Sequence, residues 1–241
     1  MGRHGTIAGR KSAQDAKRSA NFTKYARVIT VAAKAGGDPE YNASLRVAID
    51  KAKTNGLPNE NINRAIKKGT GELSGETYEE LVFEGYGPAG VAIIIEALTD
   101  NKNRTTSFVR STLDKYGGNL GTTGCVSYMF ARKGTIIIEK KDDIDEDEVL
   151  MVTLDAGADD MIVNDDSFEI LTDPLVYHDV HKAVADAGYE IAEADIEYLP
   201  SMESKPSEEH DIVKLKKLID ILEENDDVQK VYTNCDSSVL E

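Results

Sequence analysis

The sequence predicts an α+β protein, with an N-terminal three-helix domain and basic arm followed by two ferredoxin-like α/β sandwich domains, one inserted in the other. Two observations predict this class. Apolar residues recur at helical spacing up to residue 69, and from Thr77 onward strands alternate with helices. The charges divide at the same place, because residues 1–76 hold 14 Lys and Arg against 7 Asp and Glu, whereas residues 77–241 hold 14 against 37. Residues 1–76 therefore carry a net charge of +7 and residues 77–241 a net charge of −23, which together give the −16 of the whole chain.

Residues 1–20 are basic and lack a regular apolar period, so we expect a mobile arm that becomes partly helical from Ser12. A helix is then predicted from Asn21 to the glycine pair at 36–37. Its inward face consists of apolar residues at helical spacing, namely Phe22, Tyr25, Ala26, Ile29 and Ala33. At about 100° per residue, the opposite face carries Lys24, Arg27 and Lys34.

Two shorter helices follow the first one. Asn42 is the expected N-cap of a helix that runs to Thr54, where Gly56 ends it. A third helix follows Pro58 and is terminated by Gly69 and Gly71, with Arg64, Lys67 and Lys68 on its exposed side. Three such helices make a domain of roughly 55 residues, which is marginal for a core of its own. We therefore expect the helices to pack against a neighbouring domain.

Strands are predicted for residues 78–86 and 90–99, followed by a helix over 103–116 and a strand over 125–130. Residues 134–200 then give a strand, a helix, two strands, a helix and a strand. This is the element order of a ferredoxin-like sandwich. A helix and a strand remain after residue 206, and they are too few to stand alone.

Counting the elements predicts where the domains begin and end. The strands before residue 133 lack a closing helix and strand, which the last two elements of the chain would supply. We therefore predict a basic arm with a helical domain over 1–76. A discontinuous α/β domain takes 77–133 and 207–241, and an inserted ferredoxin-like domain takes 134–206.

The basic arm and helices are the strongest candidate site. Lys and Arg along one surface bind a polyanion because they release the counterions condensed on its phosphates. The predicted nucleic-acid-binding residues are Arg10, Lys11, Lys17, Arg18, Lys24, Arg27, Lys34, Arg64, Lys67 and Lys68. A solvated helical face would contain the same residues, but the contrast with the acidic remainder of the chain favours nucleic acid.

Three other motifs are more typical of structural roles. The glycine-rich run 117–124 follows a helix, precedes a strand and lacks the Lys of a phosphate-binding loop, which favours a tight turn. The acidic run 142–148 lacks the central Gly of a calcium loop and is typical of a helix start. His178 and His181 share a predicted helix without a third ligand nearby. We therefore predict no metal and no cofactor.

Composition excludes several classes of protein. Cys125 and Cys235 are far apart in the sequence, which excludes a cysteine zinc cluster and gives no disulfide framework. No apolar run reaches the roughly 18 residues that span a membrane, and the first residues do not form a signal peptide. We expect a cytoplasmic protein without a small-molecule substrate. No Ser/His/Asp, Cys/His or paired-carboxylate spacing indicates catalysis, although an enzyme with a site between domains stays an alternative.

Several segments together resemble one family. Residues 10–18, 22–24 and 36–40 are similar to the arm and first helices of YebC-type proteins, the YebC/PmpR family. The similarity continues over 61–69, 78–81, 84–88, 98–105 and 117–121 and so covers nearly the whole chain. One departure is at the start, where residues 2–7 lack the Lys and Trp with which the family opens.

The resemblance implies a helical domain, two α/β domains and a cytoplasmic, non-enzymatic regulator of gene expression. Family members are commonly described as DNA-binding transcriptional regulators. Others, including a mitochondrial translational activator, act at the ribosome, and some are linked to relief of stalled translation. The expected partner is therefore nucleic acid, either DNA or ribosomal RNA, with the ribosome as an alternative. A protein-interaction adaptor is the alternative of another class.

Overall fold

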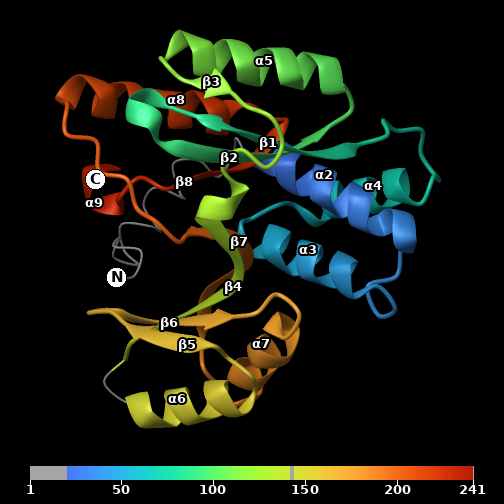
Figure 1. Cartoon of the computed structure of the whole chain (residues 1–241). Coiled ribbons are helices and arrows are strands. Elements are labelled where there is room, and N and C mark those ends of the chain that lie inside the picture. Colours follow the sequence, from blue (N-terminus) through green and yellow to red (C-terminus); the bar gives the residue numbers. More distant parts are fainter. Residues whose placement is uncertain (1–20, 142–143, 241) are drawn as a thin grey trace. The chain divides into compact units, whose positions relative to one another are not determined.

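The computed structural model describes residues 21–141 and 144–240. These residues form two compact units, one of residues 21–127 and 206–233, the other of residues 128–205 and 234–240. Each unit contains one four-stranded antiparallel sheet, as Figure 1 shows. The first unit also contains the helices α2 (Phe22–Ala32), α3 (Ala43–Thr54) and α4 (Asn59–Gly69). The predicted fold class is therefore confirmed, with N-terminal helices followed by two four-stranded antiparallel sheets.

The three helices pack around a small apolar core. The core side chains include Ile29, Leu45, Ile49 and Ile62. A short 3-10 turn, η1 (Ala33–Ala35), extends α2, and Asn42 then caps α3 as expected, because its side-chain oxygen accepts the N–H of Leu45 at 3.0 Å. The cap side chain is itself fixed, since its amide nitrogen donates to the carbonyls of Ala32 and Gly36 at 2.8 and 2.7 Å.

Gly69 has a different role from the one expected of it. It is the last residue of α4, and a Cβ atom there would lie 2.3 Å from the carbonyl oxygen of Thr30 and 2.6 Å from Cβ of Ala33. The glycine therefore allows α4 to approach α2 closely. The backbone turn that follows the helix uses Gly71, whose φ of +82° lies in the left-handed region.

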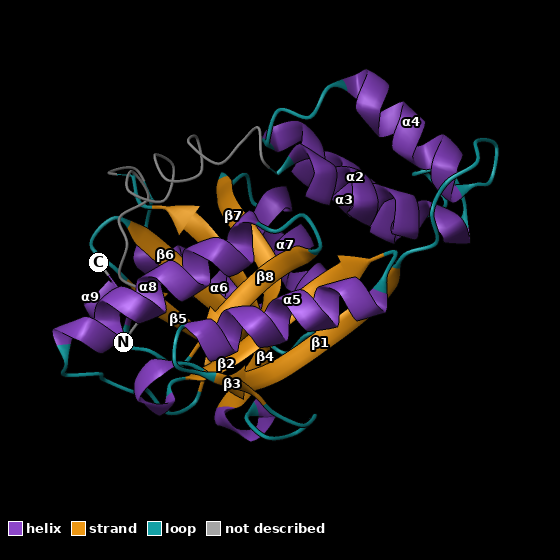
Figure 2. Cartoon of the chain, turned by 90° about the horizontal axis from the view of Figure 1, so that it is seen from above, coloured by secondary structure: helices purple, strands orange, loops and turns teal. Residues whose placement is uncertain are grey.

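The first sheet consists of β1 (Glu79–Tyr86), β2 (Ala92–Thr99), β3 (Asn119–Leu120) and β8 (Val228–Thr233), in the order β3-β1-β2-β8. The short 3-10 turn η2 (Pro88–Gly90) joins β1 to β2. Two helices, α5 (Lys102–Lys115) and α8 (Glu209–Glu224), lie side by side over one face of this sheet (Figure 2). Since β8 pairs with β2, the last helix and strand return to the first sheet. The domain boundaries themselves stay a prediction.

The second sheet has the strand order β5-β6-β4-β7. Along the chain its elements are β4 (Phe130–Glu139), α6 (Glu146–Asp155), β5 (Asp160–Val163), β6 (Ser167–Thr172), α7 (Tyr177–Asp186) and β7 (Ile191–Pro200). This connection and strand order are those of the ferredoxin-like sandwich. Its core includes Ile136, Ile138, Phe168 and Val180. Beyond β7, Ser204 forms a bridge with Cys235, and α9 (Ser237–Leu240) ends the described chain.

The acidic run starts a helix, as predicted, over the part that the structure describes. Asp145 is the N-cap of α6, and its carboxylate accepts the N–H groups of Asp147 and Glu148. Residues 142–143 of the run lie outside the described residues. Acidic side chains in the first turn of a helix are stabilised by its dipole, so this run has a structural explanation.

The strand predicted over residues 125–130 is wrong. Residues 127–129 form a 3-10 turn, η3 (Ser127–Met129), and β4 begins only at Phe130. The cause is Glu84 of β1, which is only 6% exposed and whose carboxylate accepts the N–H groups of Gly124, Val126 and Ser127 at 2.8 to 3.0 Å. Burial raises the pKa of Glu84, but these hydrogen bonds outweigh burial and lower it below its usual value. The backbone donors that a strand would use are therefore bound to a side chain.

Candidate nucleic-acid interface

Two of the predicted basic residues on α2 face the first sheet and not solvent. Lys24 is only 9% exposed, and its Nζ donates to the carbonyl oxygen of Glu223 at 2.6 Å. Arg27 donates from Nη1 to the carbonyl oxygens of Leu98 and Asp226 at 3.1 and 2.9 Å. The prediction of an outward-facing surface is therefore wrong for these two residues. They do lie opposite the core of the helical domain, but the α/β domain covers that side of α2.

Asp227 is the centre of this contact. Its side chain is 6% exposed, and its carboxylate lies 2.6 Å from Nη1 of Arg27 and 2.7 Å from Nη2 of Arg104. The hydroxyl of Thr105 donates to the same carboxylate at 2.7 Å. Burial raises the pKa of Asp227, but the hydrogen bonds from Arg104, Thr105 and Arg27 outweigh it and lower the pKa below its usual value. We call Lys24, Arg27, Arg104 and Asp227 the clasp.

The clasp explains how the small helical domain is stabilised. Lys24 and Arg27 come from α2, Arg104 from the first turn of α5, and Asp227 from the residue before β8. The guanidinium of Arg27 also lies 5.3 Å from the ring centroid of Tyr78, which makes a cation–π contact. The expectation that the helices pack against a neighbouring domain agrees with this geometry. Lys24 and Arg27, which were expected to bind phosphate, instead hold the helical domain against the first sheet.

Lys34 is the third predicted cation of this segment, and it is exposed. Its Nζ donates to the carbonyl oxygen of Tyr78 at 3.2 Å. An ammonium group has three donors, so this single bond to a neutral carbonyl leaves its charge available to an anion at the surface. Lys34 therefore stays among the candidates for nucleic-acid contact.

Helix α4 presents the other three predicted cations that the structure describes. Arg64 and Lys67 are exposed and Lys68 is half-buried. We call these three residues the α4 face. Among the residues that the structure describes, their charged groups make no ion pair. The spacing i, i+3, i+4 places all three within about one helical turn, or roughly 5–6 Å along the axis. A surface hollow beside them is lined by Glu60, Asn61, Asn63, Arg64, Lys67 and Leu73.

The four basic residues predicted in the arm, Arg10, Lys11, Lys17 and Arg18, lie outside the described residues. Their role in binding therefore stays a prediction. Of the predicted site, the structure brings Arg64, Lys67 and Lys68 together on α4.

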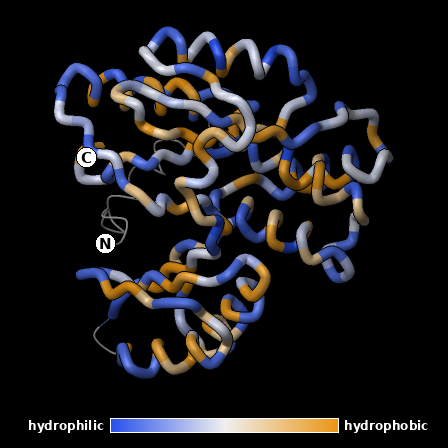
Figure 3. Tube along the Cα trace, in the orientation of Figure 1, coloured by the Kyte–Doolittle hydropathy of each residue, from blue (hydrophilic) through white to orange (hydrophobic). Residues whose placement is uncertain are grey.

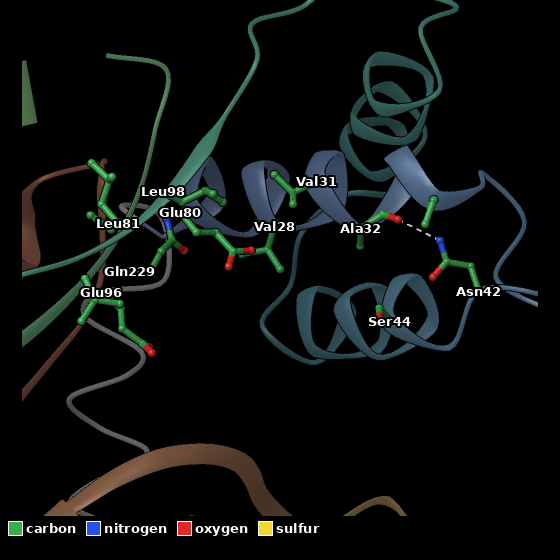
Figure 4. A pocket seen from close by; sticks show the side chains of 13 residues that line it. Val28, Val31, Ala32, Asn42, Ser44, Glu80, Leu81, Glu96, Leu98 and Gln229 are labelled. Atoms are coloured by element: carbon green, nitrogen blue, oxygen red, sulfur yellow. Dashed lines mark hydrogen bonds between the residues drawn. The ribbon is translucent and has the colours of Figure 1, made fainter. Parts of the chain in front are cut away.

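A groove of about 510 Å³ lies between α2, α3 and the strands β1 and β2 (Figure 4). Much of its lining is apolar and includes Val28, Val31 and Leu98, and its polar residues include Glu80 and Glu96. No Lys or Arg lines it among the described residues. Carboxylates at the edge of an apolar groove repel phosphate, so this groove does not extend the basic surface.

Neither a metal-binding cluster nor a membrane-spanning helix is found within residues 21–141 and 144–240. These residues include no group of three or more His, Cys, Asp or Glu side chains placed to hold a metal ion. They also include no helix with the length and apolar character to cross a membrane.

Comparison with known proteins identifies the family. The model of the TACO1/YebC protein N-terminal domain matches residues 3–72, and the model of the TACO1/YebC second and third domain matches residues 78–235. The chain belongs to the TACO1/YebC family. The resemblance found from the sequence motifs is therefore confirmed.

Individual proteins also match this chain along nearly their whole length. A protein of Clostridioides difficile is 52% identical over 97% of this chain and 98% of its own, and one of Thermoanaerobacter pseudethanolicus is 55% identical over 95% and 93%. Both carry the name "probable transcriptional regulatory protein". The crystal structure of a conserved hypothetical protein from Aquifex aeolicus, 44% identical, superposes with a TM-score of 0.81 over 92% of both chains.

The sequence motifs did not indicate what Glu84, Arg104 and Asp227 do. Glu84 and Arg104 lie in segments that resemble the TACO1/YebC family, over residues 84–88 and 98–105. Asp227 lies outside those segments and is separated from Arg27 by 200 residues. No local spacing links these groups, so the only signal in the sequence was an acidic residue directly before an apolar strand.

Proposed function

We propose that this protein is a nucleic-acid-binding regulator of gene expression that contacts phosphates through its helical domain. The observation that carries the proposal is the α4 face, where three cations within one helical turn have no carboxylate partner among the described residues. The names of the TACO1/YebC relatives support a regulatory role at the level of transcription. DNA is therefore the proposed target.

The charge of the rest of the molecule also favours a contact through the helical domain. Residues 77–241 carry a net charge of −23, so most of their surface repels a polyanion. The clasp removes Lys24 and Arg27 of α2 from the proposed contact, which consists of α4, Lys34 and the arm. Contacts of this kind position a protein on nucleic acid without reading its sequence.

The test reverses two charges of the α4 face in the full-length protein. We expect Arg64→Glu/Lys67→Glu to weaken binding to duplex DNA and to reduce the slope of log affinity against log salt by about 0.9 for each lost phosphate contact. The matched control, Lys216→Glu/Lys217→Glu, makes the same charge change on α8. An α4 variant that binds like this control would refute the α4 face as the contact surface.

Crosslinking in cells followed by sequencing identifies the target. Recovery of promoter DNA with the wild-type protein, and its loss with the α4 variant, is the expected result. Recovery of ribosomal RNA in place of DNA would overturn the transcriptional assignment and select a role in translation. A wild-type protein that recovers neither nucleic acid would overturn the proposal and leave the protein-interaction adaptor.

A further inference from the structure

Helix α5 differs in charge from the acidic domain that contains it. Residues 77–241 hold 14 Lys and Arg against 37 Asp and Glu, yet α5 alone holds four of these cations and one of the acids. The cations are Lys102, Arg104, Arg110 and Lys115, and the acid is Asp114. Figure 3 shows the strongly polar character of this helix, whose tube is mostly blue and white. Such a local excess of cations is unexpected for a helix that serves only to cover an acidic sheet.

The exposed side of α5 consists largely of hydrogen-bond donors. The donors are Lys102, Asn103, Ser107, Arg110, Ser111 and Lys115, all of them exposed, and we call them the α5 face; the exposed acid Asp114 lies among them. Arg104 is not included because Asp227 of the clasp binds it. Phosphate oxygens are bound in proteins by these residue types, namely Arg, Lys, Ser, Thr and Asn.

The cations of the α5 face are not neutralised within the described chain. Lys102, Arg110 and Lys115 make no ion pair with a described residue, and Lys115 only lies 5.5 Å from the ring centroid of Tyr116. Four lysines elsewhere in the α/β part form ion pairs, whereas Lys214, Lys216 and Lys217 of α8 make none with a described residue. Lys133 and Lys205, for example, each have Nζ 2.7 Å from a carboxylate oxygen. The charges on α5 are therefore available to an external anion.

The residue choice on α5 also reduces its stability as a helix. Ser and Asn are poorer helix formers than Ala, Lys or Glu by up to about 0.7 kcal/mol each. The inward threonines have a structural reason, since Thr105 donates to Thr99 and to Asp227. No such reason applies to the exposed Asn103 and Ser107, whose side chains make no hydrogen bond with the described residues. Their free donors are available to an external ligand that accepts hydrogen bonds.

We propose that the α5 face is a second binding surface for the phosphodiester backbone of a nucleic acid. The helix is 14 residues long, which corresponds to about 21 Å, the length of about six base pairs of duplex. At about 100° per residue, Lys102 lies at the N-terminal end of the helix in line with the buried Val109 and Leu113, so Arg110 and the serines beside it form the middle of the proposed contact. The inference rests on the proposed function, because it assigns a further contact to the same partner.

The clasp places the α5 face and the α4 face on one unit. Arg104 at the start of α5 and Arg27 of α2 bind the same carboxylate, and α4 packs closely against α2 at Gly69, so the three helices belong to one unit. When one face holds a polyanion, the second face meets it at high effective concentration. The α5 face therefore adds affinity without adding sequence specificity.

The experiment compares two double variants of the full-length protein, Lys102→Glu/Arg110→Glu on α5 and Lys216→Glu/Lys217→Glu on α8. The two pairs make the same change in net charge in neighbouring helices. With a 30-base-pair DNA duplex as probe, we expect the α5 variant to lower the salt slope by about 1.8, from two lost contacts. The ratio of wild-type to variant affinity then falls about tenfold as salt rises from 50 to 200 mM. The α8 variant keeps the wild-type slope.

The outcomes separate this inference from the proposed function. If the wild-type protein and the α5 variant bind with the same slope, or if the α5 and α8 variants lose the same amount, the α5 face is not a contact surface. If the wild-type protein fails to bind any duplex or RNA, the proposed function fails first. If charge reversal disturbs folding, the milder variant Lys102→Ala/Arg110→Ala takes its place. We expect it to keep the wild-type unfolding midpoint and to lower the salt slope of DNA binding.

Discussion

Removal of Asp227 is expected to uncouple the helical domain from the first sheet. In Asp227→Ala the guanidinium of Arg27, whose side chain is 13% exposed, loses its only carboxylate within the described residues and stays buried. Breaking a buried ion pair in this way costs about 3–5 kcal/mol. Arg104 adds little, because its side chain is 49% exposed and returns to water. Against a total stability of about 5–15 kcal/mol, this is a large loss.

Urea denaturation of the full-length protein measures this loss. With a denaturant slope of about 2 kcal/mol per molar, the expected shift of the unfolding midpoint is about 2 M. The matched control is Asp100→Ala, since Asp100 also binds Arg104 at 2.7 Å but with a side chain 27% exposed. We expect this control to cost at most about 1 kcal/mol. Equal shifts for the two variants would show that the clasp is no more than a surface ion pair.

Three further predictions follow from the same structure. Glu84→Ala should destabilise the protein by about 2–4 kcal/mol in urea, because the N–H groups of Gly124, Val126 and Ser127 lose their acceptor, and a cost below about 1 kcal/mol would contradict this. Gly69→Ala should cost about 1–3 kcal/mol, since its Cβ would meet the backbone of Thr30 at 2.3 Å. Its control Gly75→Ala meets only the flexible side chain of Lys68, at 3.3 Å, and should have little effect. The pKa of Asp227 is lowered on folding, so the stability difference between wild type and Asp227→Ala should be complete above pH 3.8 and should disappear as the pH falls through the lower folded value. Thermal melts of both proteins between pH 2 and 7 check this. A stability difference that grows as the pH falls would contradict a lowered pKa of Asp227.

The helices were predictable because their determinants are local. Asn42 caps α3 from one position before it, and the apolar spacing around Ile29 and Ile62 selects one face of each helix. The ferredoxin-like order of the second sheet followed from element order alone, since such a connection allows few arrangements. In each of these cases the residues that decide the structure are neighbours in the sequence.

The roles of the charged residues were less predictable because their partners are distant. Helical spacing placed Arg27 opposite the helical core, but it could not show that Asp227, 200 residues later, covers that side. The strand predicted over 125–130 failed for the same reason, since Glu84 binds its backbone at Val126 and Ser127 from 42 and 43 residues away. The sequence shows how many cations a segment has, whereas the structure shows which of them already bind carboxylates or carbonyls within the protein.

The clasp and the first sheet also impose an order on biosynthesis. Until β8 is made, β2 is an edge strand with the apolar sequence of Ile93, Ile94 and Ile95, and the anchor of Arg27 does not yet exist. The domain that begins the chain must therefore wait for nearly all of it to leave the ribosome, while residues 134–200 can fold first. Nascent chains that stop before residue 227 are expected to be sensitive to proteases and prone to aggregation through this unpaired edge.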